Sequence, residues 1–295
     1  PTDTYKVSAT YLDGYRAQTA FMVGGIDAVK KGKSVADAIL RKTGNIFKDN
    51  QLPSYTKTQV DLLGSEDTYG PHGRNSDARE IIVRIAVRHK LQKALKIFSK
   101  EIAHAATGMT PGITGFLGGR PKPSPNIKLF SCLIPKNVLE TEVDFAGKST
   151  PVEIPCSGGF DISLIPEIKK TTNIDFEIYK TVPLIKLAYA RSGDKGNHAN
   201  IGVIARNPEY LPIIKSALTT AAVGDYFSHL LRGEVLLWEV PGINALNILL
   251  QNSLGGGGMA SLRIDPLGKA YAQILLEFPI PVAKEIYEKL SQEKN

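Results

Sequence analysis

The spacing of hydrophobic and polar residues in the first half of the chain predicts both strands and helices. Tyr5, Val7 and Ala9 alternate with polar residues, which is typical of a strand within residues 1–10. Residues 56–63 are predicted to form a second strand. Apolar residues three and four positions apart predict helices elsewhere. These helices are expected over 15–29, from Ser34 onward, over 77–89 and over 91–105. The first half should therefore form an α/β or α+β main domain.

The pattern changes after a polar, charged stretch at 166–181, which we interpret as a linker. The next hundred residues predict the order β-β-α-β-α-β, which is compatible with an open sheet covered by helices on one face. This length is usual for one domain. The strands are expected at 184–190, 200–206, 235–240 and 270–278, and the helices over 208–231, 244–253 and, at the chain end, 283–294.

Composition and net charge limit the kinds of function that this protein can have. Among 295 residues, 42% are hydrophobic and 22% charged, as in ordinary globular proteins, and no apolar run is long enough to predict a membrane span. The net charge of +7 comes from scattered lysines without interleaved aromatic residues. Charge alone is a poor argument for nucleic-acid binding, whereas a modest positive field suits carboxylates and acyl-CoA esters.

The two cysteines, Cys132 and Cys156, have neither metal-ligand spacing nor the number needed for a disulfide framework. We therefore predict reduced thiols in an intracellular compartment, either cytoplasmic or, in a eukaryote, mitochondrial. The strand at Thr4–Tyr11 begins without a preceding polar tail. We expect it to pair with a companion N-terminal segment or chain, and we expect the protein to form a homo-oligomer.

The first candidate site is the segment that follows the strand at 184–190. Its glycines would let backbone N–H groups converge on an anion, while Arg191 offers a bidentate fork and Lys195 a point charge. Asp194 could form an acid–base couple with Lys195 or with His198 in a dry site. The same residues also suit a polar β-hairpin turn, and residue physics alone favours the turn. The candidate ligand-binding residues here are Arg191, Ser192, Gly193, Gly196 and Asn200.

The second candidate is a long loop over 107–125, rich in glycine and proline. Long irregular loops inside domains are often functional, and this one contains apolar residues such as Phe116. A folded binding loop and a structural crossover are equal alternatives. The candidate ligand-binding residues are Thr107, Gly108, Gly118, Gly119 and Arg120.

A third segment, 64–74, contains Glu66 and His72 as possible general acid–base groups, although a structural turn is the more ordinary explanation. The run Gly255–Gly258 suits either close backbone approach or a flexible turn. The five histidines lack metal-ligand spacing. We predict neither a metal nor a cofactor.

Three of these stretches carry a family resemblance. They are Val7–Ala17, Thr107–Pro121 with the strand that ends at Pro135, and Ala190–Gly196 with Ala199–Gly202. Together they resemble the downstream half of acyclic terpene utilisation (AtuA) family proteins. The resemblance implies an AtuA-like core over 1–165, the linker at 166–181, a ferredoxin-fold domain over 182–281 and a terminal helix over 282–295. Asn197 and His198 stand where the family pattern has Asp and a small residue.

The resemblance implies a role in catabolism of acyclic terpenoids or branched-chain acids, handled as carboxylates or acyl-CoA esters at the glycine-rich loops. It implies no particular reaction. An enzyme would bring Asp194, Lys195, Arg120 and His72 to one pocket. The alternative is a non-catalytic binding or assembly subunit of an acyl-CoA-processing complex, in which these residues would be dispersed.

Overall fold

The computed structural model describes residues 2–158, 161, 163 and 177–292. The chain divides into two compact units. The first consists of Pro1–Leu12 and Ile127–Lys170, and the second of Asp13–Asn126 and Thr171–Asn295. Most of the linker predicted at 166–181, namely 166–176, lies outside the described residues.

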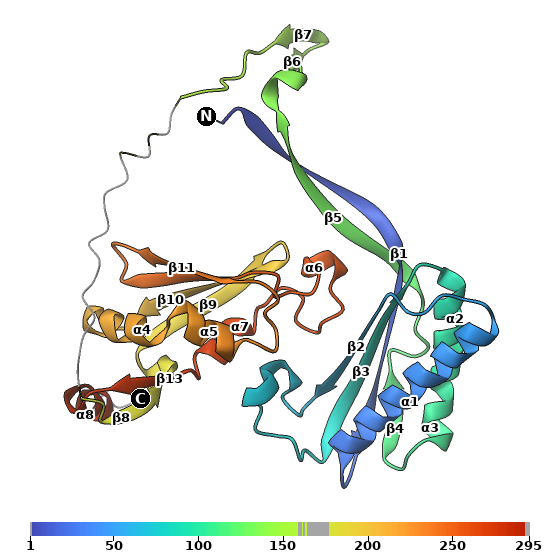
Figure 1. Cartoon of the computed structure of the whole chain (residues 1–295). Helices are drawn as coiled ribbons and strands as arrows, with labels where there is room; N and C mark the ends of the chain where they lie inside the picture. The colour runs from blue at the N-terminus through green and yellow to red at the C-terminus, as the bar shows by residue number, and fades with distance from the viewer. Residues whose placement is uncertain (1, 159–160, 162, 164–176, 293–295) are drawn as a thin grey trace. The chain divides into compact units, whose positions relative to one another are not determined.

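The first unit is built on a two-stranded ribbon. The outer part of β1 (Thr4–Gly24) runs beside β5 (Ser124–Pro135), as Figure 1 shows. The backbone N–H of Lys136 donates to the Asp3 carbonyl at 2.9 Å. A short 3-10 turn (Lys136–Val138) leads to the hairpin of β6 (Glu142–Phe145) and β7 (Lys148–Pro151). The strand expected at Thr4–Tyr11 thus has a partner strand within the same chain.

The second unit contains a five-stranded sheet in the order β2-β3-β1-β4, with β5 also paired to β1. Its further strands are β2 (Lys57–Leu63), β3 (Glu80–His89) and β4 (Ile113–Leu117). Three helices accompany the sheet: α1 (Ala28–Asp49), α2 (Gln92–Glu101) and α3 (Ala105–Gly108). Phe21, Val83 and Phe98 are among the fully buried residues of the core they enclose.

Two helices expected in this region were wrong. Residues 15–24 belong to β1, and residues 80–89 form β3. In β1 the buried positions Ala17, Thr19, Phe21 and Val23 alternate strictly, which is the period of a strand. In β3 the many β-branched residues favour an extended backbone over a helix. The predictions of β2, of the helical segment from Ser34 and of a helix near 91–105 are confirmed.

The long loop expected over 107–125 is partly regular. Thr107 and Gly108 end α3, and β4 pairs antiparallel with β1 through Phe116 opposite Phe21. Irregular backbone remains at 118–123, where Gly118 and Gly119 have φ values of 77° and 69°.

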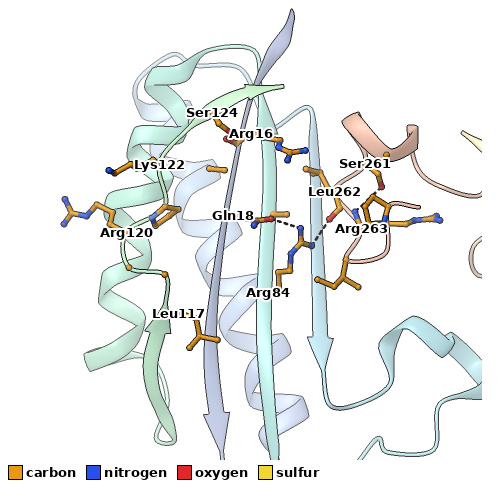
Figure 2. Close-up of a pocket in the computed structure, with 18 residues that line it drawn as sticks. Arg16, Gln18, Arg84, Leu117, Arg120, Lys122, Ser124, Ser261, Leu262 and Arg263 are labelled. Carbon is orange, nitrogen blue, oxygen red and sulfur yellow. Dashed lines mark hydrogen bonds between the residues drawn. The ribbon is translucent and has the colours of Figure 1, made fainter. Parts of the chain in front are cut away.

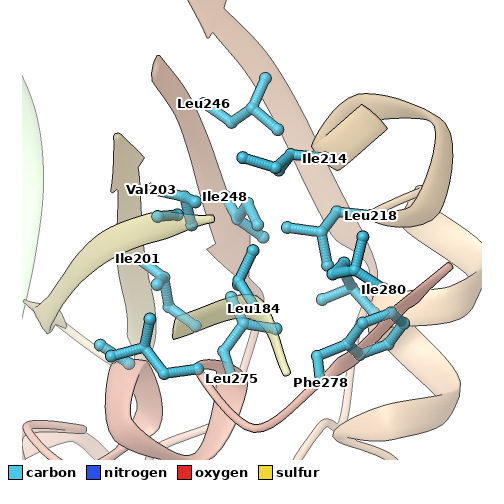
Figure 3. Packing of buried hydrophobic residues seen from close by; sticks show 14 of the residues in the cluster. Leu184, Ile201, Val203, Ile214, Leu218, Leu246, Ile248, Leu275, Phe278 and Ile280 are labelled. Carbon is cyan, nitrogen blue, oxygen red and sulfur yellow. The ribbon is translucent and has the colours of Figure 1, made fainter. Parts of the chain in front are cut away.

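The ferredoxin-like region of the second unit contains a four-stranded antiparallel sheet in the order β11-β12-β10-β9. In Figure 1, α4, α5 and α7 lie on one side of this sheet. Figure 3 shows the apolar core between them, with Ile201, Ile248 and Leu275 among its buried members. The strands are β9 (Ala188–Lys195), β10 (His198–Ala205), β11 (Val235–Val240) and β12 (Ala245–Leu250). The helices are α4 (Leu211–Ala217), α5 (Thr220–Tyr226), α6 (Gly257–Ala260) and α7 (Tyr271–Leu275).

A second pair of strands, β8 (Lys180–Pro183) and β13 (Pro279–Val282), and the helix α8 (Lys284–Gln292) complete the described chain. The expected fold class, a mixed main region followed by a smaller α+β ferredoxin-like domain, is confirmed. No helix in the described ranges has the length and apolar character needed to cross a membrane.

Three details of this region differ from the sequence predictions. The helix expected at 244–253 is β12, which follows a turn with Gly242 and Asn244 at positive φ. Much of the strand expected at 270–278 is α7, and the Ala272 backbone N–H in its first turn donates to the Ser192 hydroxyl. The strand expected at 184–190 lies further along the chain: Leu184–Lys186 form a 3-10 turn, and β9 continues past residue 190 into a tight hairpin with β10.

Candidate anion-binding cavity

A cavity of about 780 Å³ lies in the second unit, and Figure 2 shows its lining. Five cationic side chains line it, and its described lining contains no carboxylate. The cationic residues are Arg16 on β1, Arg84 on β3, Arg120 and Lys122 after β4, and Arg263 after α6. Guanidinium groups bind carboxylates and phosphates through paired hydrogen bonds. The lining therefore has the chemistry of an anion site.

Arg84 is held in place by three neighbours. Its Nη1 donates to Asp61 Oδ2 at 2.5 Å and to the Leu262 carbonyl at 2.7 Å, and its Nη2 donates to Gln18 Oε1 at 2.8 Å (Figure 2). Asp61 is only 6% exposed, so this ion pair is well shielded from water. Arg84 is thus a fixed, largely neutralised part of the wall.

Arg16 and Arg263 are different, because neither forms an ion pair with a described carboxylate. Arg16 Nη1 donates to the Met259 carbonyl at 3.2 Å. Arg263 donates to the carbonyls of Ser253 and Leu230 and to the Tyr271 hydroxyl. Burial raises the pKa of Tyr271, whose hydroxyl donates to the Ser253 carbonyl at 2.7 Å. These two guanidinium charges are left to attract an anion.

The glycine-rich segment after β4 forms another wall. No heavy atom lies within 4 Å of a Cβ placed on Gly118 or Gly119, so the backbone is open on that side. In Figure 2 the side chains of Arg120 and Lys122 extend away from Arg16 and Arg84. Within the described part of the chain, neither cation has a hydrogen bond or an ion pair. They contribute positive charge at the edge of the cavity.

A second cavity, of about 320 Å³, shares Arg263 with the first and is also lined by His229 and Tyr271. Burial lowers the pKa of His229, although the nearby Thr68 backbone opposes this shift. Neither ring nitrogen has a hydrogen-bond partner of good geometry among the described residues. Burial therefore favours the neutral imidazole.

Comparison with known families identifies the chain. The family model of the acyclic terpene utilisation family protein AtuA matches residues 1–145, and the model of the AtuA ferredoxin-like domain matches residues 182–281. The chain belongs to the AtuA family. Membership supports a role in terpene catabolism. No curated protein and no solved structure gives a significant match.

In this AtuA family protein, the sequence-predicted residues of the hairpin lie on two faces of β9. Strand alternation places Arg191, Gly193 and Lys195 on the face away from the helices, and Ser192 and Asp194 on the opposite face. The buried Ser192 hydroxyl accepts from the Ala272 backbone N–H at 2.9 Å and donates to the Lys269 carbonyl at 3.2 Å. Ser192 therefore has an evident role in attaching α7 to β9.

The other hairpin residues have equally defined places. Gly196 forms the turn with φ 68°, and Asn200 donates from its side chain to the side chain of Asn247. A Cβ on Gly257 would lie 2.7 Å from the Gly196 carbonyl oxygen. The Gly255–Gly258 run thus allows close backbone approach to the hairpin turn.

Glu66 and His72 both have local structural contacts. Glu66 Oε2 accepts from the Arg74 backbone N–H at 2.7 Å. The His72 ring stacks on Tyr226 with a centroid distance of 3.8 Å, and its Nε2 lies 2.9 Å from the Tyr226 carbonyl oxygen. Glu66 and His72 line neither cavity.

The structure does not bring together the four residues that an enzyme was expected to gather in one pocket. Arg120 lines the larger cavity with Gly118 and Gly119, whereas Asp194, Lys195 and His72 do not, and neither do Thr107 and Gly108. Sequence analysis missed Arg16, Arg84 and Arg263. One signal was available for Arg84, since a charged residue within the apolar run of β3 must find a partner.

Proposed function

We propose that this AtuA family protein binds an acyclic terpenoid or branched-chain acid, as a carboxylate or acyl-CoA ester, in the arginine-lined cavity. The observation that carries the proposal is the pair Arg16 and Arg263, which face a described lining without any carboxylate. An anion there would gain charge-assisted hydrogen bonds at sites that no internal carboxylate occupies.

The rest of the cavity supports a ligand with an apolar portion. Leu117, Leu262 and Ile264 line it beside the arginines. Its volume lies within the range of about 300–1,000 Å³ that is typical of small-molecule sites. The Gly118–Gly119 backbone lets a ligand approach without meeting a Cβ. A charged head and a branched hydrocarbon chain would both find suitable contacts.

One observation favours binding without catalysis. The described lining of this cavity contains no His, Asp, Glu, Cys or Tyr. These residue types supply most general acids and bases in enzymes, and of the common nucleophile types the described lining holds only Ser124, Ser261 and Lys122. The alternative function, a non-catalytic binding or assembly subunit of an acyl-CoA-processing complex, therefore has support of its own.

Calorimetric titration of the whole chain with 3-methylbut-2-enoate and with its CoA thioester would test the proposal. Replacing Arg16 by Ala should weaken binding about ten- to hundredfold, because it removes a charge-assisted contact from a partly buried site. Arg41→Ala is the matched control, since Arg41 is exposed on α1 and does not line the cavity.

Equal affinities for the folded wild-type, Arg16→Ala and Arg41→Ala proteins would overturn the cavity as the binding site. Turnover of the thioester during titration would favour the enzyme. Stable binding without turnover would favour the subunit.

A further inference from the structure

One face of the ferredoxin-like sheet carries no helix in Figure 1. The strand registers place Trp238, Asn247, Gly202 and Arg191 in a single row across all four strands. Side chains on this row alternate with the buried core residues, so they project to the uncovered side. The row has an aromatic side chain at one end and a guanidinium at the other.

In the middle of this face, two positions carry no side chain because they are glycines. Gly202 lies between Asn247 and Arg191, and Gly193 lies beside Asn200 in the neighbouring row. A Cβ placed on Gly193 would lie 2.9 Å from Lys269 Nζ, so the lysine ammonium occupies the space above this glycine. A second cation, the Lys269 ammonium, therefore lies beside the row.

The charge of the face is positive. Arg191, Lys195 and Lys269 have no side-chain hydrogen bond or ion pair with another described residue. The four strands place no carboxylate on this face, because Asp194 and Glu239 belong to the opposite one, where Glu239 pairs with Lys215. Such a surface attracts anions.

The aromatic residues on this face suit a ligand with a single planar group. Trp238 is 47% exposed and is the only tryptophan in the chain. Tyr189 is also exposed, but the Arg206 guanidinium already stacks on its ring, with Cζ 3.9 Å from the centroid. One open aromatic platform suits one base, whereas binders of single-stranded nucleic acid stack successive bases on several aromatic residues.

We propose that this open face binds a nucleoside diphosphate, with its base stacked on Trp238 and its phosphates on Arg191 and Lys269. Three strand spacings separate Trp238 from Arg191, or about 14 Å. A nucleotide lying along the row, met by the long arginine side chain, bridges this separation. Gly202 lies under the ribose, where any side chain would obstruct it. The site uses none of the residues of the arginine-lined cavity, so the two proposals stand or fall separately.

The single tryptophan makes the test direct. Titration of the whole chain with ADP should quench the fluorescence of Trp238 and reach saturation. Arg191→Ala should weaken ADP binding about tenfold, because an exposed charge-assisted contact is lost. Adenosine, which lacks phosphates, should bind at least as weakly to the wild-type protein as ADP does to this variant.

Gly202→Val tests the shape of the face without changing its charge. The nearest atom to a Cβ at this position is the Arg191 carbonyl oxygen at 3.9 Å, and valine suits a strand, so folding should be retained. The branched side chain should abolish quenching. Lys93→Ala on α2 is the control for lost charge, and Arg16→Ala separates this site from the cavity; both should bind ADP like the wild type.

Absence of quenching and of calorimetric heat at millimolar ADP would overturn the proposal. Unchanged ADP affinity in folded Arg191→Ala protein would do the same, even if Gly202→Val failed to fold. Binding of a single-stranded oligonucleotide but not of ADP would instead show a nucleic-acid surface.

Discussion

Two glycine-rich segments of this protein, 107–121 and 191–202, look alike in sequence but use glycine differently. In the first, Gly112, Gly118 and Gly119 all have positive φ, so glycine supplies backbone shapes that other residues avoid. In the second, only Gly196 at the turn does so. Gly193 and Gly202 are strand residues, where glycine supplies the absence of a side chain.

This difference matters for function. The first segment shapes an irregular wall for the arginine-lined cavity, whereas the second leaves a flat sheet face open. A glycine-rich motif alone therefore does not indicate a phosphate-binding loop. The distinction predicts a graded series of stabilities when each glycine is replaced by alanine.

Gly112→Ala should have the largest effect. Its φ is 97°, and a Cβ there would lie 2.2 Å from the Gly24 carbonyl oxygen, just beyond the register shift of β1 and β4 at Met22 and Val23. Strain and steric overlap together should lower the free energy of unfolding by about 3 kcal/mol. Urea denaturation monitored by circular dichroism measures this change.

Gly44→Ala is the matched control for that measurement. Gly44 lies within α1, and no atom lies within 4 Å of a Cβ built there. Alanine should raise stability by about 0.5–1 kcal/mol through its higher helix propensity. If Gly112→Ala lowered the free energy of unfolding by less than about 1 kcal/mol, the steric argument would be contradicted.

Gly118→Ala should have an intermediate effect. Its φ of 77° disfavours alanine, but no neighbouring atom obstructs the new Cβ. The expected loss is about 1 kcal/mol, from backbone strain alone. Equal losses for Gly112→Ala and Gly118→Ala in the same urea experiment would mean that packing contributes nothing at Gly112.

Gly193→Ala should have the smallest effect, within about 0.5 kcal/mol of the wild type. Its backbone is extended, and the one atom close to the new Cβ is the mobile end of Lys269. The urea midpoint should be unchanged, whereas ADP quenching of Trp238 should weaken as Lys269 is displaced. A large loss of stability would show that glycine is needed here for backbone conformation.

The sequence predicted the elements whose periodicity is unambiguous. β2, α2, β10 and β11 lie close to their expected positions. The inner part of β1 was taken for a helix because Asp13 could cap one, and β3 was taken for a helix because Ile81, Ile82, Ile85 and Ala86 would lie on one side of it. In β3, the largely shielded Arg84 pairs with Asp61 and the buried Arg88 pairs with Asp13. Tertiary partners made the strand possible, and local spacing does not reveal them.

The site was predictable only in part. Gly118, Gly119 and Arg120 were selected from one continuous segment and do line the cavity. Arg16, Arg84 and Arg263 come from three distant segments, and only the folded sheet brings them together. No spacing rule relates them, so sequence reasoning had no basis for joining them.

Arg263 lines both cavities, and this has a thermodynamic consequence. An anion in the larger cavity that draws this guanidinium from the Tyr271 hydroxyl and the Ser253 carbonyl also changes the environment offered to a ligand near His229. Linkage is reciprocal: if the first ligand changes the affinity for the second by some factor, the second changes the affinity for the first by the same factor. Two compounds, titrated in both orders, would yield one coupling free energy, with Arg263 as the charged residue that both cavities share.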